Sequence, residues 1–175
     1  MFFNLNIQQD MEDLVNHKGN GIHYYSFFKL GLTTEIEISS SSAKIYKALI
    51  EFHNYTAWNP SITEVQGTAK MGTLLKARIQ WPGLKNNNYL LKITELIPNY
   101  KIRWIGHFWF KYFLDGDHIF LIQETDNPQK TTVKQSEMFT GFLVPIFSFF
   151  LKRNIFNGFL LLNQSLKNYV EGLDR

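Results

Sequence analysis

The sequence predicts an α+β fold in which one antiparallel sheet packs against a single long helix at the C-terminus. Two observations carry this prediction. Six segments with strand-like alternation of apolar and polar residues follow one another between residues 62 and 139, and the connections between them are short. Short connections between consecutive strands indicate an antiparallel meander. The chain then ends in one long segment with helical periodicity, and a helix on one face of such a sheet defines an α+β layer.

The C-terminal helix is predicted from Pro145 to Leu173. Proline suits the first position of a helix, where its missing N–H costs nothing. Beyond it, apolar residues recur at steps of three and four, which places them on one helical face. They are Phe147, Leu151, Ile155, Phe159, Leu162, Leu166, Tyr169 and Leu173. A helix of this length spans about 40 Å, so it crosses a whole small domain.

The first half of this helix also carries apolar residues on its opposite face, namely Ile146, Phe149, Phe150, Leu160 and Leu161. Residues 22–28 follow a glycine-rich turn at 19–21 and are strongly apolar as well, as in a strand or a clasp. Because both surfaces lack another partner, we expect residues 22–28 to cover the outer face of the helix. Residues 1–32 are otherwise an N-terminal extension of unknown role, and residues 33–175 form the main domain.

The remaining elements are read in order from local patterns. Ile36 and Ile38 alternate with Glu35 and Glu37, as in a half-buried strand over residues 33–39. The serines that follow are N-cap candidates for a short amphipathic helix. An aromatic turn comes next, then the six strands, with an Asp-Gly-Asp turn before the fifth of them. These elements are expected at residues 40–52 (helix), 55–60 (aromatic turn), 62–66, 73–81, 89–96, 100–108, 118–124 and 131–139 (strands), and 115–117 (Asp-Gly-Asp turn).

Composition bounds the class of protein. A chain of 175 residues is expected to form one domain with a sizeable core, and 45% hydrophobic with 19% charged residues is ordinary for a globular chain. The net charge is +3, but lysine and arginine are scattered, so a nucleic-acid-binding surface is not indicated. The lack of cysteine excludes disulfides, cysteine–zinc sites and thiol catalysis, and it fits a reducing compartment. Residues 1–20 do not read as a signal peptide, and we expect a cytoplasmic protein.

No segment reads as a transmembrane helix or as a metal site. The most apolar window, residues 139–151, is shorter than the roughly 20 residues that a membrane span needs, so we interpret it as buried. A peripheral membrane contact through Phe149 and Phe150 stays open. No two of the histidines at positions 17, 23, 53 and 107 have the spacing of metal ligands on one element. No metal or cofactor is expected.

Several segments, in a fixed order, carry a family resemblance. They are Thr33–Ile38, Ser40–Phe52, the turn Tyr55–Pro60, Gly67 followed by Gly72, Arg103–Gly106, Leu114–Phe120 and Gln135–Gly141. Over residues 33–171 the chain resembles the START-like superfamily, also called SRPBCC, which includes birch-pollen-allergen-like proteins, polyketide cyclases and dehydrases, and lipid-transfer domains. The resemblance implies a helix-grip fold: a strongly curved seven-stranded antiparallel sheet around the C-terminal helix, with a cavity between them and a short helix after the first strand. It also implies that a hydrophobic small molecule or lipid binds there.

Strand alternation predicts the wall of this cavity. If Trp104 and Phe120 face the helix, every second residue of each strand shares that face, which is then mostly apolar with a few polar groups, as in a small-molecule pocket. Trp58 is interpreted chiefly as a core anchor, with the cavity wall as the alternative. The predicted ligand-binding residues are Trp58, Ala77, Ile79, Leu91, Ile93, Trp104, His118, Phe120, Gln135, Glu137, Phe139, Leu151, Ile155 and Phe159.

His118 and Glu137 are the candidate catalytic pair within this set. They suit acid–base cyclisation or dehydration of a polyketide-like substrate. The alternatives are that they satisfy each other by hydrogen bonding, or that a one-residue register slip turns both outward.

Three functions follow, and the sequence leaves the ligand and the oligomeric state open. The leading hypothesis is non-enzymatic binding of a hydrophobic small molecule or lipid. The second is a polyketide cyclase/dehydrase-like enzyme. The third is a co-chaperone-like interaction module that docks through Phe149, Phe150, Leu160 and Leu161.

Overall fold

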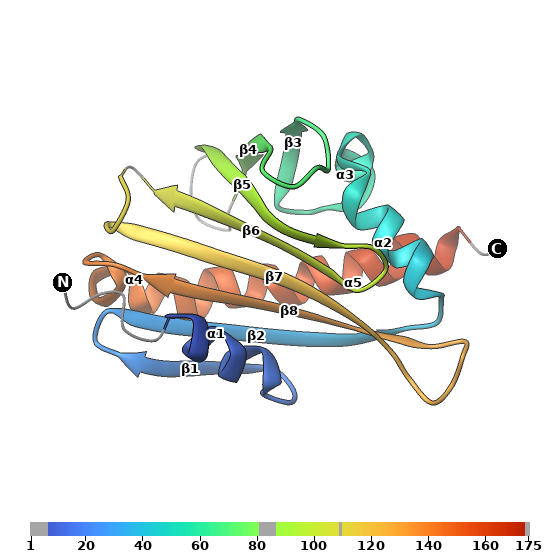
Figure 1. Cartoon of the computed structure of the whole chain (residues 1–175), viewed down its shortest axis with the longest axis horizontal. Coiled ribbons are helices and arrows are strands. Elements are labelled where there is room, and N and C mark those ends of the chain that lie inside the picture. Colours follow the sequence, from blue (N-terminus) through green and yellow to red (C-terminus); the bar gives the residue numbers. More distant parts are fainter. Residues whose placement is uncertain (1–6, 81–86, 109, 174–175) are drawn as a thin grey trace.

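The computed structural model describes residues 7–80, 87–108 and 110–173, which form one antiparallel sheet of eight strands (Figure 1). The strand order is β1-β2-β8-β7-β6-β5-β4-β3. The strands are β1 (Gly21–Ser26), β2 (Lys29–Ile38), β3 (Ile62–Gln66), β4 (Leu74–Ile79), β5 (Asn87–Ile97), β6 (Lys101–Phe108), β7 (Leu114–Glu124) and β8 (Thr131–Thr140). The helices are α1 (Ile7–Asn16), α2 (Ser42–Ile50), the 3-10 turn η1 (Phe52–Asn54), α3 (Tyr55–Trp58), α4 (Val144–Phe150), the π turn η2 (Leu151–Ile155) and α5 (Phe156–Gly172).

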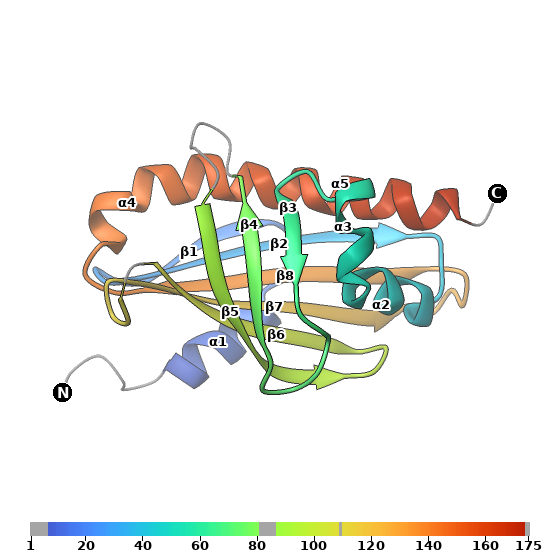
Figure 2. The same ribbon diagram turned by 90° about the horizontal axis from the view of Figure 1, so that it is seen from above.

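The sheet curves around the C-terminal helix. Figure 2 shows β3, β4 and β5 running steeply across the direction of β2 and β8, with α4 and α5 on one side of the sheet and α1 on the other. We call the side that carries α4 and α5 the concave face and the side that carries α1 the convex face. The predicted helix-grip α+β architecture is therefore confirmed.

The described residues contain eight strands where seven were predicted. The additional strand is β1, which pairs antiparallel with β2 at the edge of the sheet. β2 itself begins at Lys29, so the boundary drawn between residues 32 and 33 falls inside a strand. The division into an extension and a main domain stays a prediction about domain organisation.

The expectation that residues 22–28 cover the outer face of the C-terminal helix is wrong. Pairing with β2 satisfies the backbone N–H and C=O groups of β1 that face β2, which a side-chain contact with the helix would leave unpaired. Ile22 does reach the apolar cluster around α4, but it does so from within the sheet. The outer face of the helix stays exposed at Ile146 and Phe149.

The convex face is covered instead by α1. Met11 and Leu14 of this helix are buried against Ile119 and Met138, which lie on the convex side of β7 and β8. The spacing of three between Met11 and Leu14 places both side chains on one face of α1. Residues 7–16 therefore form part of the fold.

The aromatic turn predicted at residues 55–60 contains the short helix α3. The hydroxyl of Tyr55 donates to the carbonyl of Leu49 at 2.6 Å, which ties α3 to the end of α2. The side-chain oxygen of Asn59 accepts from the backbone N–H groups of Ser61 and Ile62 at 3.0 and 2.8 Å. These bonds turn the chain into β3.

The C-terminal helix runs from Val144 to Gly172 in three parts, because the π turn η2 separates α4 from α5. The predicted apolar face is buried from Leu151 to Leu166, whereas Leu173 lies beyond the end of α5 and is exposed. π turns are rare and occur frequently at functional sites. In the described part of the chain, no helix meets the length and hydropathy that a membrane crossing requires.

Candidate functional site

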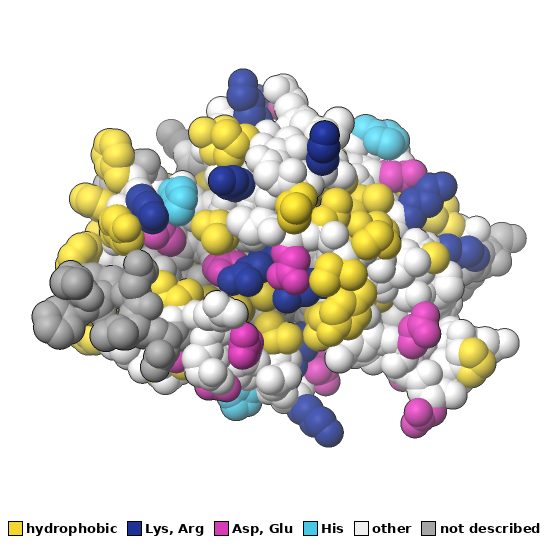
Figure 3. Space-filling view, viewed as in Figure 1, with side chains coloured by type: hydrophobic (Ala, Val, Ile, Leu, Met, Phe, Trp, Pro, Cys, Tyr) yellow, Lys and Arg dark blue, Asp and Glu magenta, His cyan; other side chains and the backbone are white. Residues whose placement is uncertain are grey.

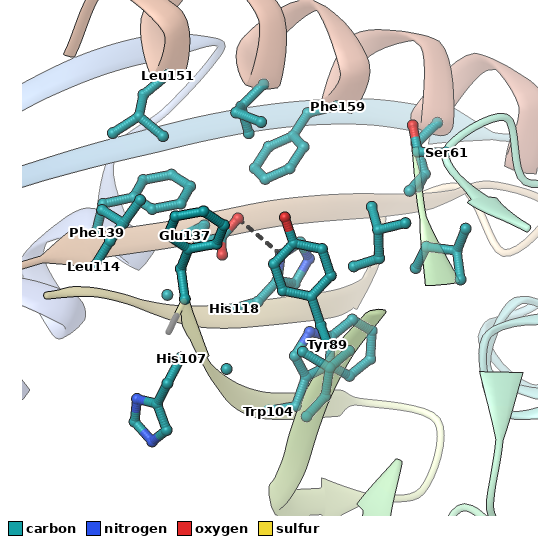
Figure 4. Close-up of a pocket in the computed structure, with 18 of the residues that line it drawn as sticks. Ser61, Tyr89, Trp104, His107, Leu114, His118, Glu137, Phe139, Leu151 and Phe159 are labelled. Atoms are coloured by element: carbon teal, nitrogen blue, oxygen red, sulfur yellow. Dashed lines mark hydrogen bonds and ion pairs between the residues drawn. The ribbon is translucent and has the colours of Figure 1, made fainter. Parts of the chain in front are cut away.

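A cavity of about 130 Å³ lies between the concave face and the C-terminal helix (Figure 4). Apolar side chains form most of its wall. Ten of the fourteen predicted ligand-binding residues line it: Ile79, Leu91, Trp104, His118, Phe120, Glu137, Phe139, Leu151, Ile155 and Phe159. The strand alternation read from the sequence therefore places most of the wall as expected.

The cavity does not reach the other four predicted residues. Trp58, Ala77 and Ile93 belong to the packed core beneath α2 and the last turns of α5, where Trp58 stacks on Tyr169 at 6.0 Å. Gln135 is fully buried outside the lining. These residues share a buried position with the lining, but the cavity does not extend to them.

Several lining residues were not predicted. They are Tyr55, Asn59, Ser61, Ile62, Tyr89, Phe108, Leu114, Phe147, Phe150, Leu162 and positions Gly106, His107 and Gly116. Strand alternation puts Tyr89 on the face of Leu91, so its position was readable from the sequence. The contribution of Phe150 was readable as well, because Phe150 follows Phe147 by three residues within α4, and its assignment to the opposite face of the helix is wrong.

His118 and Glu137 lie side by side at the centre of the lining. The register of β7 and β8 pairs them directly, so the one-residue slip that would turn them outward does not occur. His118 Nδ1 lies 3.4 Å from Glu137 Oε2, and the two side chains are 8% and 13% exposed. This hydrogen bond is long, and it leaves Nε2 of His118 buried without a hydrogen-bond partner among the described residues.

Aromatic rings hold the His118 imidazole in place. It stacks on Trp104 with ring centroids 5.0 Å apart, and it meets the edge of Phe159 at 5.2 Å. When Nδ1–H donates to Glu137, the neutral imidazole presents a lone pair at Nε2. The His118 ring therefore offers one hydrogen-bonding atom, Nε2, inside an aromatic surround.

Two glycines leave room for this pair. Gly106 and Gly116 lie opposite each other on β6 and β7. A Cβ at Gly116 would overlap Oε1 of Glu137, and one at Gly106 would lie 2.7 Å from Cδ2 of Leu91. The missing side chains thus accommodate the Glu137 carboxylate and the Leu91 side chain beside the cavity.

Apart from Glu137, the charged residues next to the cavity belong to the convex face. Residues 115–117, predicted as a turn, lie within β7, and Asp117 accepts from Nε and Nη2 of Arg103 at 2.8 and 2.6 Å. Hydrogen bonding to Asp117 raises the pKa of Arg103. The His107 side chain pairs with Asp115 at 2.7 Å and points away from the cavity (Figure 4).

The described residues contain no group of three or more His, Cys, Asp or Glu side chains arranged to hold a metal ion. The polar groups that line the cavity include an imidazole, a carboxylate and the Tyr89 and Ser61 hydroxyls at an apolar wall (Figure 4).

No protein-family model and no curated protein matches this chain. Solved structures do match it. A START superfamily protein from Mycobacterium smegmatis is 16% identical with a TM-score of 0.64, and the match covers 82% of this chain and 98% of that one. The Zhui aromatase/cyclase from Streptomyces sp. R1128 is 12% identical with a TM-score of 0.70 over 84% and 96% of the two chains.

Norcoclaurine synthase from Thalictrum flavum, solved in complex with dopamine and hydroxybenzaldehyde, is 13% identical with a TM-score of 0.64, over 82% of this chain and 87% of that one. At these identities the similarity shows the fold. The resemblance to the START-like superfamily is thus confirmed as a shared helix-grip fold.

Proposed function

We propose that this protein binds a hydrophobic small molecule in the cavity between the sheet and the C-terminal helix. The observation that carries the proposal is the buried Nε2 of His118, which lies in an aromatic surround and has no hydrogen-bond partner among the residues that the structure describes. Buried polar atoms are normally hydrogen-bonded, so this nitrogen suits a polar group of a ligand. A mostly apolar wall with one or two placed polar groups is the usual constitution of a small-molecule site.

The size of the cavity bounds the ligand. Its volume of about 130 Å³ is close to that of an engineered apolar cavity that accepts benzene. Pockets for whole drug-sized molecules have about 300 Å³ or more, so this conformation holds a ring or a short chain and not a complete lipid. Trp104, Phe120 and Phe159 offer the ring edges and faces that aromatic ligands pack against.

A cavity-filling substitution tests the proposal. Leu91→Phe adds a ring to the cavity wall, whereas Leu90→Phe adds the same ring to an exposed neighbour on the other face of β5. With 4-fluorophenol as the probe in fluorine NMR, we expect wild type and Leu90→Phe to bind alike and Leu91→Phe to bind about tenfold more weakly.

Equal binding by the two variants would contradict the proposal, as would the absence of probe binding to wild type. Mass spectrometry under non-denaturing conditions complements the titration, because it detects an apolar molecule that remains bound through purification. Urea unfolding of each variant checks that the added ring has not changed the folded population.

A second candidate is the polyketide cyclase/dehydrase-like enzyme. It is favoured by the contact between the Glu137 carboxylate and the His118 imidazole. Glu137 contacts Nδ1 of His118, so the carboxylate orients the imidazole and stabilises the imidazolium that forms when Nε2 takes a proton from a substrate. If this reaction occurs, the wild type turns over a polyketide-like substrate and His118→Ala abolishes that turnover, whereas non-enzymatic binding predicts no turnover by the wild type. The cytoplasmic location stays a prediction.

A further inference from the structure

Exposed aromatic and aliphatic side chains gather at one end of the molecule. They come from the β1–β2 loop, the β6–β7 loop, the β8–α4 loop and α4, which lie together at the left of Figures 1 and 2. We call this set the aromatic end. It consists of Phe27, Phe110, Phe113, Phe142, Ile146 and Phe149, of which four are more than two-thirds exposed.

Backbone hydrogen bonds fix the three loops to one another. The N–H of Gly141 donates to Phe28 at 3.1 Å, and the N–H of Phe142 donates to Tyr112 at 3.1 Å. The N–H of Leu143 donates to Phe113 at 2.8 Å. The loops that carry the exposed rings are therefore held together by backbone hydrogen bonds.

Basic side chains flank the aromatic end. Lys111 lies 5.0 Å from the ring of Tyr112, and Lys152 lies 5.4 Å from that of Tyr24, while Arg153 is exposed on the π turn. Figure 3 shows Lys or Arg and His side chains among the hydrophobic ones at this end.

The neighbouring acidic groups are already paired. Asp10 and Asp115 bond with Lys29 and His107 at 2.6 and 2.7 Å. A histidine neutralises a carboxylate only when it is protonated, so the positive charge around the exposed rings comes from the excess of Lys111, Lys152 and Arg153 over Asp115.

We propose that the aromatic end binds the surface of a membrane that contains anionic lipid. Exposed rings beside lysine and arginine fit the boundary between acyl chains and headgroups, and each basic residue near an anionic surface adds about 1 kcal/mol. Four separate projecting segments reach a planar surface together, whereas a protein partner would have to match each of them. The positive flank selects anionic headgroups.

Helix α4 connects this surface with the cavity. Phe147 and Phe150 line the cavity, while Ile146 and Phe149 on the same helix are exposed at 74% and 69%. A membrane that contacts α4 thus touches the outer side of the cavity wall. The membrane contact is argued from the surface alone and does not depend on the proposed ligand.

The test is vesicle flotation of the full chain. We expect wild type to float with phosphatidylcholine vesicles that contain about 30% phosphatidylserine, and to bind pure phosphatidylcholine about tenfold more weakly. Phe149→Asp is expected to weaken binding to the anionic vesicles about tenfold and Lys111→Glu about fivefold, with salt weakening the wild type as well. Met71→Asp is the matched control, because Met71 has the same 69% exposure as Phe149 but lies in the β3–β4 loop.

Three outcomes would overturn the proposal. Wild type could fail to float with anionic vesicles, or Met71→Asp could lose as much binding as Phe149→Asp. Size-exclusion chromatography could also reveal a dimer that Phe149→Asp dissolves, in which case a second copy of the chain covers this surface. Circular dichroism of each variant checks that it is folded.

Discussion

Asp117 and His118 are consecutive residues of β7 on opposite faces of the sheet, and their surroundings differ. On the convex face, Asp117 accepts two short hydrogen bonds from Arg103, one at each carboxylate oxygen. On the concave face, His118 makes one long contact with Glu137 and keeps a buried ring nitrogen without a partner among the described residues. A completed ion pair fixes structure, whereas an unmet hydrogen-bonding atom at a cavity can still be met by a ligand.

The apolar surroundings of the two faces differ in the same way. Leu14 of α1 packs so closely on the convex side that a Cβ at Gly31 would lie 2.6 Å from its Cδ1. On the concave side the π turn and two strand glycines border a cavity. The hydroxyls of Tyr25 and Ser136 near the convex face also lack protein partners in the described residues, so the contrast lies in the charged groups and in the packing.

The largest loss of stability is expected from truncating a side chain that packs on the convex face. Leu14→Ala should lower the free energy of unfolding by about 3 kcal/mol, because a filled site leaves a new void. Leu151→Ala should cost about 2 kcal/mol, since Leu151 already borders a cavity and its removal only enlarges it. Urea unfolding measures both. A larger loss for Leu151→Ala would contradict the contrast in packing.

The next prediction compares the stability that the Asp117–Arg103 pair contributes with that of the Glu137–His118 pair. Asp117→Ala leaves Arg103 half-buried without its bidentate partner and should cost about 2 kcal/mol. Glu137→Ala breaks only the long contact to His118 and should cost under about 1 kcal/mol. The same unfolding measurement compares them, and the reverse order would show that the concave pair is the structural one.

A smaller loss of stability should follow from adding a side chain at Gly116, next to the Glu137 carboxylate. Gly116→Ala displaces the Glu137 carboxylate, which is the end of a flexible side chain, so we expect a loss within about 1 kcal/mol. Nitrogen NMR of the His118 imidazole should report the lost contact as a changed tautomer signal. Gly172→Ala is the control, because no heavy atom lies within 4 Å of its added Cβ. An unchanged His118 signal in Gly116→Ala would show that the glycine does not position Glu137.

The smallest effect concerns pH and the convex face. Burial lowers the pKa of His23, and the nearby His17 and Lys134 charges lower it further. A lowered pKa means that the folded state binds fewer protons than the unfolded state below about pH 6.5, so stability falls as the pH drops through that value. His23→Gln removes this titration and should lose less stability than wild type between about pH 7 and pH 5. Exposed His53→Gln serves as the control, and identical pH profiles for wild type and His23→Gln would contradict the expectation.

The sequence by itself determined the layer architecture and most of the cavity wall. Alternation along a strand is a local property, so it placed Trp104, His118 and Glu137 on one face before any contact was known. Helical spacing likewise identified Leu151, Ile155 and Phe159 as the face turned toward the sheet. These predictions hold because the backbone period alone fixes where each side chain points.

The tertiary structure decided the parts that depend on distant neighbours. Residues 22–28 read as a strand or a clasp, but the pairing of β1 with β2 and the packing of α1 on the convex face arise from non-local contacts, which a local pattern does not specify. The extent of the cavity was decided in the same way. Ala77 and Gln135 share the face of the lining residues, but the neighbouring elements close the space in front of them. Sequence periodicity orients a side chain, and only packing determines whether another atom already occupies the volume it faces.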